Sequence, residues 1–106
     1  GFKVMRYDPS TGMVISGANS RLSFRLVEGA TIKMPEQGIF IGGSARYVLD
    51  YYGGLFPSEV LLVFEFDTKD IVSGDPFDRE PELGVRKAKL IEWLVLGDWV
   101  IEKGKK

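Results

Sequence analysis

The sequence predicts an α+β domain built on a mainly antiparallel sheet of about six strands, with one short helix over residues 44–52. Three observations lead to this prediction. Several stretches alternate apolar and polar residues with the period of two that a half-buried strand requires. One stretch has the spacing of an amphipathic helix. The length of 106 residues is usual for one domain, so we expect residues 1–106 to form a single domain.

The strand predictions rest on alternation and on turn residues. The clearest strand is 21–26, where Leu22, Phe24 and Leu26 share one face. The segment 60–66 is apolar on both faces as far as Glu65, which is typical of a central strand. Further strands are predicted at residues 2–7, 13–16, 38–43, 85–96 and 99–102, and residues 31–34 are a brief extended stretch. The acidic segment 67–81 contains prolines and a glycine, and we expect a long solvated loop there.

The helix prediction has a start signal, a buried face and a stop signal. Ser44 is a favourable N-cap residue for a helix over 45–52. Apolar and aromatic residues recur at helical spacing, which predicts an inner face made of Ala45, Val48, Leu49 and Tyr52. The pair Gly53–Gly54 predicts the end of the helix.

The composition excludes several kinds of chemistry. The chain has no Cys, which excludes disulfides and thiolate nucleophiles, and no His, which excludes the commonest general base and metal ligand. Any chemistry would come from carboxylates, hydroxyls, Arg, Lys or backbone groups. We therefore expect no metal site and no cofactor.

Charge and hydropathy limit the partners. The net charge is −1, so nucleic-acid binding is not expected. No apolar run approaches the roughly 18 residues that a membrane span needs. The start of the chain lacks the basic and apolar segments of a secretory signal, and we expect a cytoplasmic protein. The scarcity of Asn, Gln and Cys favours a thermophilic source.

The first candidate site is the segment Gly42-Gly43-Ser44, between a strand and the start of the helix. Exposed N–H groups there, together with the helix dipole, would suit an anion such as a nucleotide phosphate. The segment has neither of the usual phosphate-loop patterns. The other interpretation is a tight turn that leads into a capped helix.

The second candidate is Glu92. Counting by twos along 85–96 places it on one face with Ala88, Leu90 and Leu94, so that a core-facing Leu face would bury a carboxylate. Such a carboxylate needs a cation or a proton, and perturbed carboxylates concentrate in functional sites. Two alternatives remain open, which are a structural pair with an Arg and a strand whose Trp93 face is the inner one. Glu65 has a similar status near a strand end, where a carboxylate usually lies at the rim of the sheet.

Two further groups have binding and structural interpretations. The acidic loop and the residue after it offer oxygen ligands for Ca²⁺ or Mg²⁺, although their spacing matches no EF-hand and a solvated loop is the other interpretation. This acidic set is Asp67, Asp70, Asp75, Asp78, Glu80 and Glu82. Several aromatic residues could line a pocket or a partner surface, or else fill the core, with Tyr52 the candidate ligand contact. This aromatic set is Tyr47, Tyr51, Tyr52, Phe56, Trp93 and Trp99.

Five segments in order resemble a family of small uncharacterised phage and bacterial domains with a "GFHxC … YY … VxEV … AxKI" pattern. They are GFKV at the start, GIFI at 38–41, VLDYY at 48–52, VLLVFE at 60–65 and RKAKLI at 86–91, so the resemblance covers roughly residues 2–92. Phe40 and Gly42 stand where the family has its His and Cys. If those two residues carry the family's function, this chain has lost it.

The outline also resembles the split-sheet fold of ADP-ribosyltransferases, which use an Arg or His on the first strand, a Ser or Tyr in the middle and a late Glu. The resemblance implies Arg6, Ser44 and Glu92 as catalytic candidates. The chain departs from the pattern, because no Ser-Thr-Ser appears and Leu90 stands two before Glu92.

Together these features predict a non-catalytic module that binds a protein or a small ligand, of viral, plasmid or prophage type. The alternative is a nucleotide-binding or ADP-ribosyltransferase-like enzyme. A homodimer that assembles through a sheet edge or through Trp99 is a third hypothesis.

Overall fold

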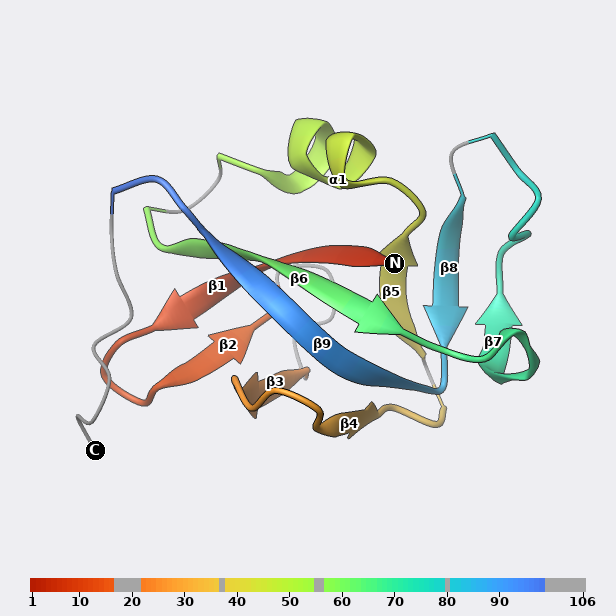
Figure 1. Cartoon of the computed structure of the whole chain (residues 1–106), viewed down its shortest axis with the longest axis horizontal. Coiled ribbons are helices and arrows are strands. Elements are labelled where there is room, and N and C mark those ends of the chain that lie inside the picture. Colours follow the sequence, from red (N-terminus) through yellow and green to blue (C-terminus); the bar gives the residue numbers. More distant parts are fainter. Residues whose placement is uncertain (17–21, 37, 55–56, 80, 99–106) are drawn as a thin grey trace.

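A computed structural model describes residues 1–16, 22–36, 38–54, 57–79 and 81–98 of the chain. It confirms the α+β class, with a mostly antiparallel sheet and the predicted helix (Figure 1). The strands are β1 (Phe2–Asp8), β2 (Met13–Ile15), β3 (Ser23–Arg25), β4 (Thr31–Lys33), β5 (Ile39–Gly42), β6 (Glu59–Glu65), β7 (Ile71–Ser73), β8 (Glu82–Val85) and β9 (Lys87–Leu96). The helices are α1 (Ala45–Tyr52) and the short 3₁₀ helix η1 (Thr68–Asp70).

The sheet has nine strands in the described part of the chain, which corrects the expected six. The main path runs β4-β9-β6-β1-β5-β8-β7, and β2 joins β1 to β3. The prediction of a loop throughout 67–81 was wrong, because this stretch contains η1 and β7, and β8 follows at once. Strands of three or four residues give too little alternation to be recognised among prolines and acidic residues. The strand predicted at 99–102 lies outside the described residues.

Strand β1 has a divided edge. Along one side it pairs with β6, from Phe2 with Val63 to Arg6 with Glu59. On the other side its first residue pairs with Gly42 of β5, whereas its last three residues pair with β2. The sheet therefore branches at β1, with β2 and β3 on one arm and β5, β8 and β7 on the other.

Helix α1 forms as predicted. The Ser44 hydroxyl accepts a hydrogen bond from the Tyr47 N–H at 3.0 Å, and the Gly53 N–H bonds to the Leu49 carbonyl at 3.0 Å. Val48 is buried, whereas Arg46, Asp50 and Tyr51 are exposed. Figure 1 shows the helix lying against one side of the sheet, where it contacts β1 and β5. Among the described residues, no helix has the length and apolar character needed to cross a membrane.

The other face of the sheet holds the main core, which includes Met5, Leu62, Phe64 and Leu90. Along β9, the core-facing positions change from even-numbered to odd-numbered residues. Val63 pairs with Glu92, whereas the next residue of β6, Phe64, pairs with Leu90, so Ile91 is an extra residue on β9.

The extra residue corrects the predicted facing of Glu92. Before Ile91, Ala88 and Leu90 point into the core, and after it Trp93 packs against the core and Glu92 is exposed. Counting by twos failed because a bulge reverses the faces beyond it. The alternative in which the Trp93 face is the inner one is correct for the end of the strand.

Candidate functional site

The candidate site begins where β5 leads into α1. Gly42 lies directly under the helix, because a side chain there would overlap Cγ1 of Val48. The Gly43 N–H donates to the Pro81 carbonyl at 2.8 Å, and the Ser44 hydroxyl caps the helix. These groups of the predicted anion site are thus engaged within the protein, in agreement with the interpretation of a turn and a capped helix.

Beside this turn lies a group that we call the tyrosine cluster, made of Tyr47, Tyr51 and Tyr52 of α1 with Glu82 of β8. The Tyr52 hydroxyl donates a 2.6 Å hydrogen bond to Oε1 of Glu82. The Tyr47 hydroxyl donates to Oε2 of the same carboxylate at 3.3 Å. Glu82 reaches the helix because it pairs with Gly42 across β5 and β8, which places it at the foot of α1. One carboxylate therefore fixes two aromatic rings.

The third tyrosine completes a continuous aromatic surface. The Tyr51 ring stacks on Tyr47, with centroids 5.9 Å apart and planes at 29°, and lies 4.7 Å from the Tyr52 ring. Tyr51 is 66% exposed. Next to it, Arg46 and Asp50 form an exposed ion pair at 3.8 Å. These two residues, with Tyr47 and Tyr51, line a small hollow of about 230 Å³.

The electrostatics of the cluster favour hydrogen bonding over proton transfer. Burial and the neighbouring Glu82 carboxylate raise the pKa of Tyr52 well above its usual value. The phenol therefore keeps its proton at neutral pH and acts as a donor. Both oxygens of Glu82 accept hydrogen bonds from tyrosines, so this carboxylate holds the two phenols in place.

Lys3 lies on the core side of the sheet near the cluster. It is 5% exposed, and its ammonium donates to the Phe40 carbonyl at 3.0 Å. Burial lowers the pKa of Lys3 to about 8, and the charge of Glu82 opposes this shift. The hydrogen bond joins β1 to β5, two strands that pair directly at Phe2 and Gly42.

The three catalytic candidates do not converge. Gly42, Phe2, Val63 and Glu92 lie in one row across β5, β1, β6 and β9. Three strand spacings separate Gly42 from Glu92, which is about 14 Å. Ser44 lies beyond Gly42 at the start of the helix.

Arg6 lies at the opposite end of β1 from this row. It is four residues beyond Phe2, about 13 Å along the strand, where it is exposed and pairs with Glu59. Glu59 is buried and accepts a 2.7 Å hydrogen bond from the Gly54 N–H just after α1. Of the predicted ligand-binding residues, Gly42 and Tyr52 are linked through Glu82, which pairs with Gly42 in the sheet and accepts the Tyr52 hydroxyl, whereas Ser44 caps the other end of α1.

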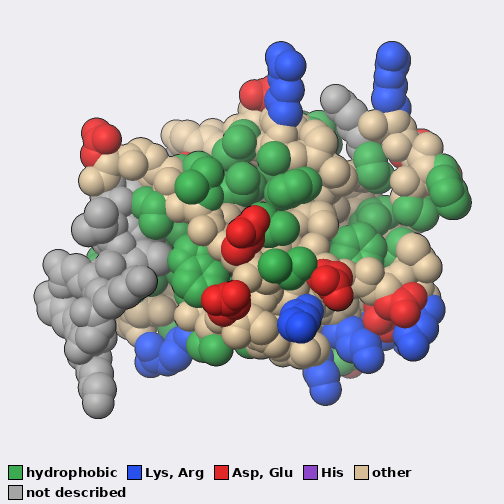
Figure 2. Space-filling model, in the orientation of Figure 1, with side chains coloured by type: hydrophobic (Ala, Val, Ile, Leu, Met, Phe, Trp, Pro, Cys, Tyr) green, Lys and Arg blue, Asp and Glu red, His purple; other side chains and the backbone are tan. Residues whose placement is uncertain are grey.

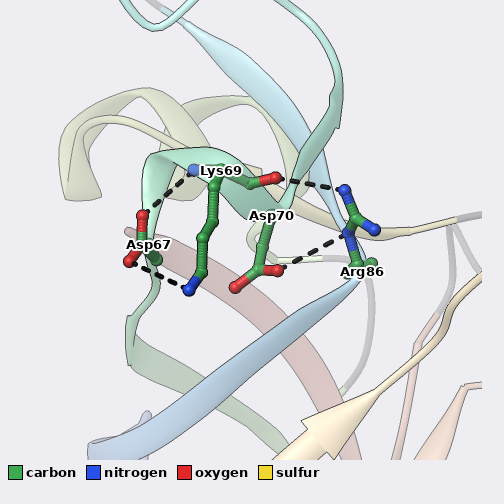
Figure 3. A network of polar contacts seen from close by, with 4 residues as sticks. All are labelled: Asp67, Lys69, Asp70 and Arg86. Atoms are coloured by element: carbon green, nitrogen blue, oxygen red, sulfur yellow. Dashed lines mark hydrogen bonds and ion pairs between the residues drawn. The ribbon is translucent and has the colours of Figure 1, made fainter.

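The acidic residues after β6 serve the local fold (Figure 3). Asp67 accepts the Lys69 N–H at 3.1 Å and so caps η1. Asp70 is buried and pairs with Arg86 at 3.5 Å, and the Arg86 guanidinium also donates to the Lys69 carbonyl at 3.1 Å. Glu65 is exposed at the end of β6. Within the described ranges, no three carboxylates come together as metal ligands would.

Sequence reasoning missed Glu82 and Lys3. Glu82 was counted as part of a solvated acidic loop, and only its pairing with Gly42 shows that it lies beneath the helix. Lys3 could have been found from the sequence, because it falls on the inward-facing positions of the alternating first strand. A buried ammonium there requires a hydrogen-bond acceptor. Phe56 and Trp99, two of the predicted aromatic contacts, lie outside the described residues.

No protein-family model, curated protein or solved structure matches the chain.

Proposed function

We propose that this chain is a non-catalytic binding module and that the tyrosine cluster is the surface that contacts a partner protein. The observation that carries the proposal is the double hydrogen bond of Glu82, which holds Tyr47 and Tyr52 in place while Tyr51 stays exposed. Tyrosine is over-represented among the residues that dominate binding energy at protein interfaces. Side chains held in their bound geometry lose less entropy on association.

The charges around the cluster indicate the chemistry of the partner. Arg46 and Asp50 are both strongly exposed beside the hollow, and the ion pair between them is weak. Each side chain can therefore leave this pair and form a hydrogen bond with a partner. A partner segment that places an apolar or aromatic side chain on Tyr51 and polar groups at its rim would match this surface. We also propose that the protein works in the cytoplasm and comes from a virus, a plasmid or a prophage.

The alternative is the nucleotide-binding or ADP-ribosyltransferase-like enzyme. It requires Arg6, Ser44 and Glu92 in one cleft. In the strand register these residues lie too far apart to contact the same substrate atom. This separation favours the binding module. A thermal-shift titration with millimolar NAD tests the alternative, because a ligand of the native state raises the melting temperature, and a rise that is lost in Glu92→Gln would place NAD at this site.

The proposal is tested by interface mutagenesis with a purified partner. A protein captured on the immobilised chain is purified, and its affinity is measured by titration calorimetry. Tyr51→Ala should weaken binding by at least tenfold, as loss of an aromatic anchor does. Phe77→Ala is the matched control, since Phe77 is 93% exposed and lies outside the cluster. A partner that binds Tyr51→Ala and Glu82→Gln as tightly as the wild type would overturn the proposal.

A further inference from the structure

A second surface feature is an open groove at the end of the sheet where β9 begins. It has a volume of about 800 Å³ and is lined by residues of β4, the end of β6, η1 and the start of β9. Four lysines line it, which are Lys33, Lys69, Lys87 and Lys89. We call it the lysine groove. Figure 2 shows Lys and Arg side chains gathered at the lower right of the molecule, near the start of β9 in Figure 1.

Strand register places three of these lysines on one face. Lys33 pairs directly with Lys87 across β4 and β9, and Lys89 follows two residues along the same strand. Residues directly opposite in an antiparallel pair have Cβ atoms about 5 Å apart, and residues two apart on a strand are about 7 Å apart. All three side chains are exposed, whereas Ile32 and Ala88, between them in the register, point into the core.

Two of the three carboxylates that line the groove have partners other than Lys33 and Lys87. Asp70 is buried against Arg86, and Asp67 pairs with Lys69 (Figure 3). Glu65 lies opposite Lys89 in the strand register, but no ion pair joins the two side chains among the described residues. Among the described carboxylates, none forms an ion pair with Lys33 or Lys87. Two like charges therefore face each other, an arrangement that destabilises a sheet.

We propose that the lysine groove binds a small phosphate-bearing ligand, with the phosphate between Lys33 and Lys87. A doubly charged oxyanion would turn the repulsion between the two ammonium groups into two attractive contacts, and Lys89 is within reach of the same anion. Thr31 and Thr68 add hydroxyl donors at the walls of the groove. Phe66 also lines the groove, where its ring offers an apolar surface to a base or sugar.

The test uses the full chain, labelled with ¹⁵N and titrated at low ionic strength with inorganic pyrophosphate, ADP and adenosine in separate series. Saturable shifts at Thr31, Lys33, Lys87 and Lys89 are expected with the first two ligands. ADP binding that is tighter than pyrophosphate binding, with shifts that extend to Phe66, would identify a nucleotide. Equal affinities would identify the inorganic anion. Absence of saturable shifts at millimolar pyrophosphate and ADP would overturn the proposal.

Matched variants separate the groove from general charge. Lys33→Gln combined with Lys87→Gln should weaken binding by at least tenfold. Arg25→Gln combined with Arg79→Gln removes the same charge from exposed positions outside the groove and should leave binding within about twofold. Equal losses in both double variants would mean that the anion senses net charge alone, and the groove proposal would fail.

A ligand-free measurement tests the premise. Lys87→Gln should raise the melting temperature by about 1–5 °C at low salt, because it removes a cross-strand repulsion. The gain should fade near 1 M salt, where screening is strong. A lower melting temperature for this variant at low salt would contradict the opposition of Lys33 and Lys87.

Discussion

The hydroxyl of Tyr52 and Oε1 of Glu82 are 2.6 Å apart, although the two residues are thirty positions apart in the chain. This bond fastens the last turn of α1 to the first residue of β8. The Tyr47 hydroxyl donates to the other oxygen of the same carboxylate, so the helix is held at two points along its length.

Tyr52→Phe removes the shorter of these bonds and leaves the ring in place. We expect the free energy of unfolding to fall by about 1 kcal/mol, less than for a fully buried bond to a charged group because this pair is partly exposed. Urea denaturation measures the change. Tyr51→Phe is the control, since the Tyr51 hydroxyl makes no hydrogen bond with the described residues, and it should change stability by less than about 0.5 kcal/mol. Equal effects of the two variants would contradict the structural role of the bond.

Lys3 should make stability depend on alkaline pH. Its pKa is about 8 in the folded chain and 10.5 when solvated, so between these values the unfolded chain binds more protons. Stability therefore rises with pH in this window, and below pH 8 the folded protein bears the full cost of a buried charge. We expect a gain of about 2 kcal/mol between pH 8 and pH 10, measured by urea denaturation.

The matched variants for this pH effect are Lys3→Met and Lys33→Met. Lys3→Met should abolish the rise, because no buried ammonium remains. Lys33→Met alters an exposed lysine and should preserve it. A wild-type stability that is flat or falls from pH 8 to pH 10 would show that Lys3 is not desolvated in the folded chain.

The bulge at Ile91 predicts opposite effects for neighbouring residues of β9. Glu92→Gln should change the free energy of unfolding by less than about 0.5 kcal/mol, because Glu92 is exposed. Leu90→Ala should cost about 2–5 kcal/mol, because Leu90 is fully buried in the core.

Deletion of Ile91 is a sharper test of the same register. Without this residue the pairs Val63–Glu92 and Phe64–Leu90 become consecutive, and every other residue of β9 keeps its face. The shortened chain should therefore fold and unfold cooperatively, as followed by circular dichroism. Deletion of Lys89 would reverse the faces on one side of the gap and should abolish cooperative unfolding. If the Ile91 deletion variant fails to fold, the assigned bulge is wrong.

Gly42 should tolerate no side chain. A methyl group there would overlap Cγ1 of Val48, so Gly42→Ala must displace α1 from the sheet. We expect a loss of about 1–3 kcal/mol, the usual cost of overpacking. Gly54→Ala is the control, because its added methyl meets no atom within 4 Å and only the positive φ of 82° opposes it, at about 1–2 kcal/mol. Both costs are read from urea unfolding midpoints. If adding Val48→Ala restores the stability lost in Gly42→Ala, the strain of that variant lies at the contact between residue 42 and the helix.

Arg86 should matter more to stability than the other cations near η1. Arg86→Ala leaves the buried carboxylate of Asp70 without its cation and removes the donor to the Lys69 carbonyl. We expect a cost of about 1–3 kcal/mol, since Arg86 is itself half exposed. Lys69→Ala breaks only an exposed 4.0 Å pair and should cost less than about 0.5 kcal/mol. Thermal unfolding of both variants in the same buffer provides the comparison, and equal shifts would contradict it.

The sequence predicted those elements whose signals are local. The cap at Ser44, the apolar positions of α1 and the glycine stop lie within a dozen residues, and the structure has each of them. The alternation of Leu22, Phe24 and Leu26 likewise matches their greater burial relative to Ser23 and Arg25. Strands β7 and β8 were too short to show a period, and they form because β5 offers an edge to β8 and β8 in turn offers one to β7. Strand β4 lies within the brief extended stretch predicted at 31–34, and it forms on the edge of the much longer β9.

The site could not be predicted in the same way. Tyr52 was a candidate by residue type alone, whereas Glu82 became part of the site only through the pairing of β5 with β8. The facing of Glu92 depends on one unpaired residue, and a one-residue bulge leaves no mark in an otherwise apolar strand. Distances between candidates such as Arg6 and Ser44 depend on the order of strands in the sheet, which alternation does not encode.

The branching of the sheet at β1 has a consequence for how the chain is made. Of the nine described strands, β1 is synthesised first, yet β6, which pairs with it from Phe2 to Arg6, is synthesised some fifty residues later. Until then the backbone donors and acceptors of β1 have only β2 and, at a single residue, β5 to pair with. Strand β1 would therefore stay open to aggregation or to chaperones until β6 has been made, and this sheet should acquire protease resistance in one late, nearly all-or-none event.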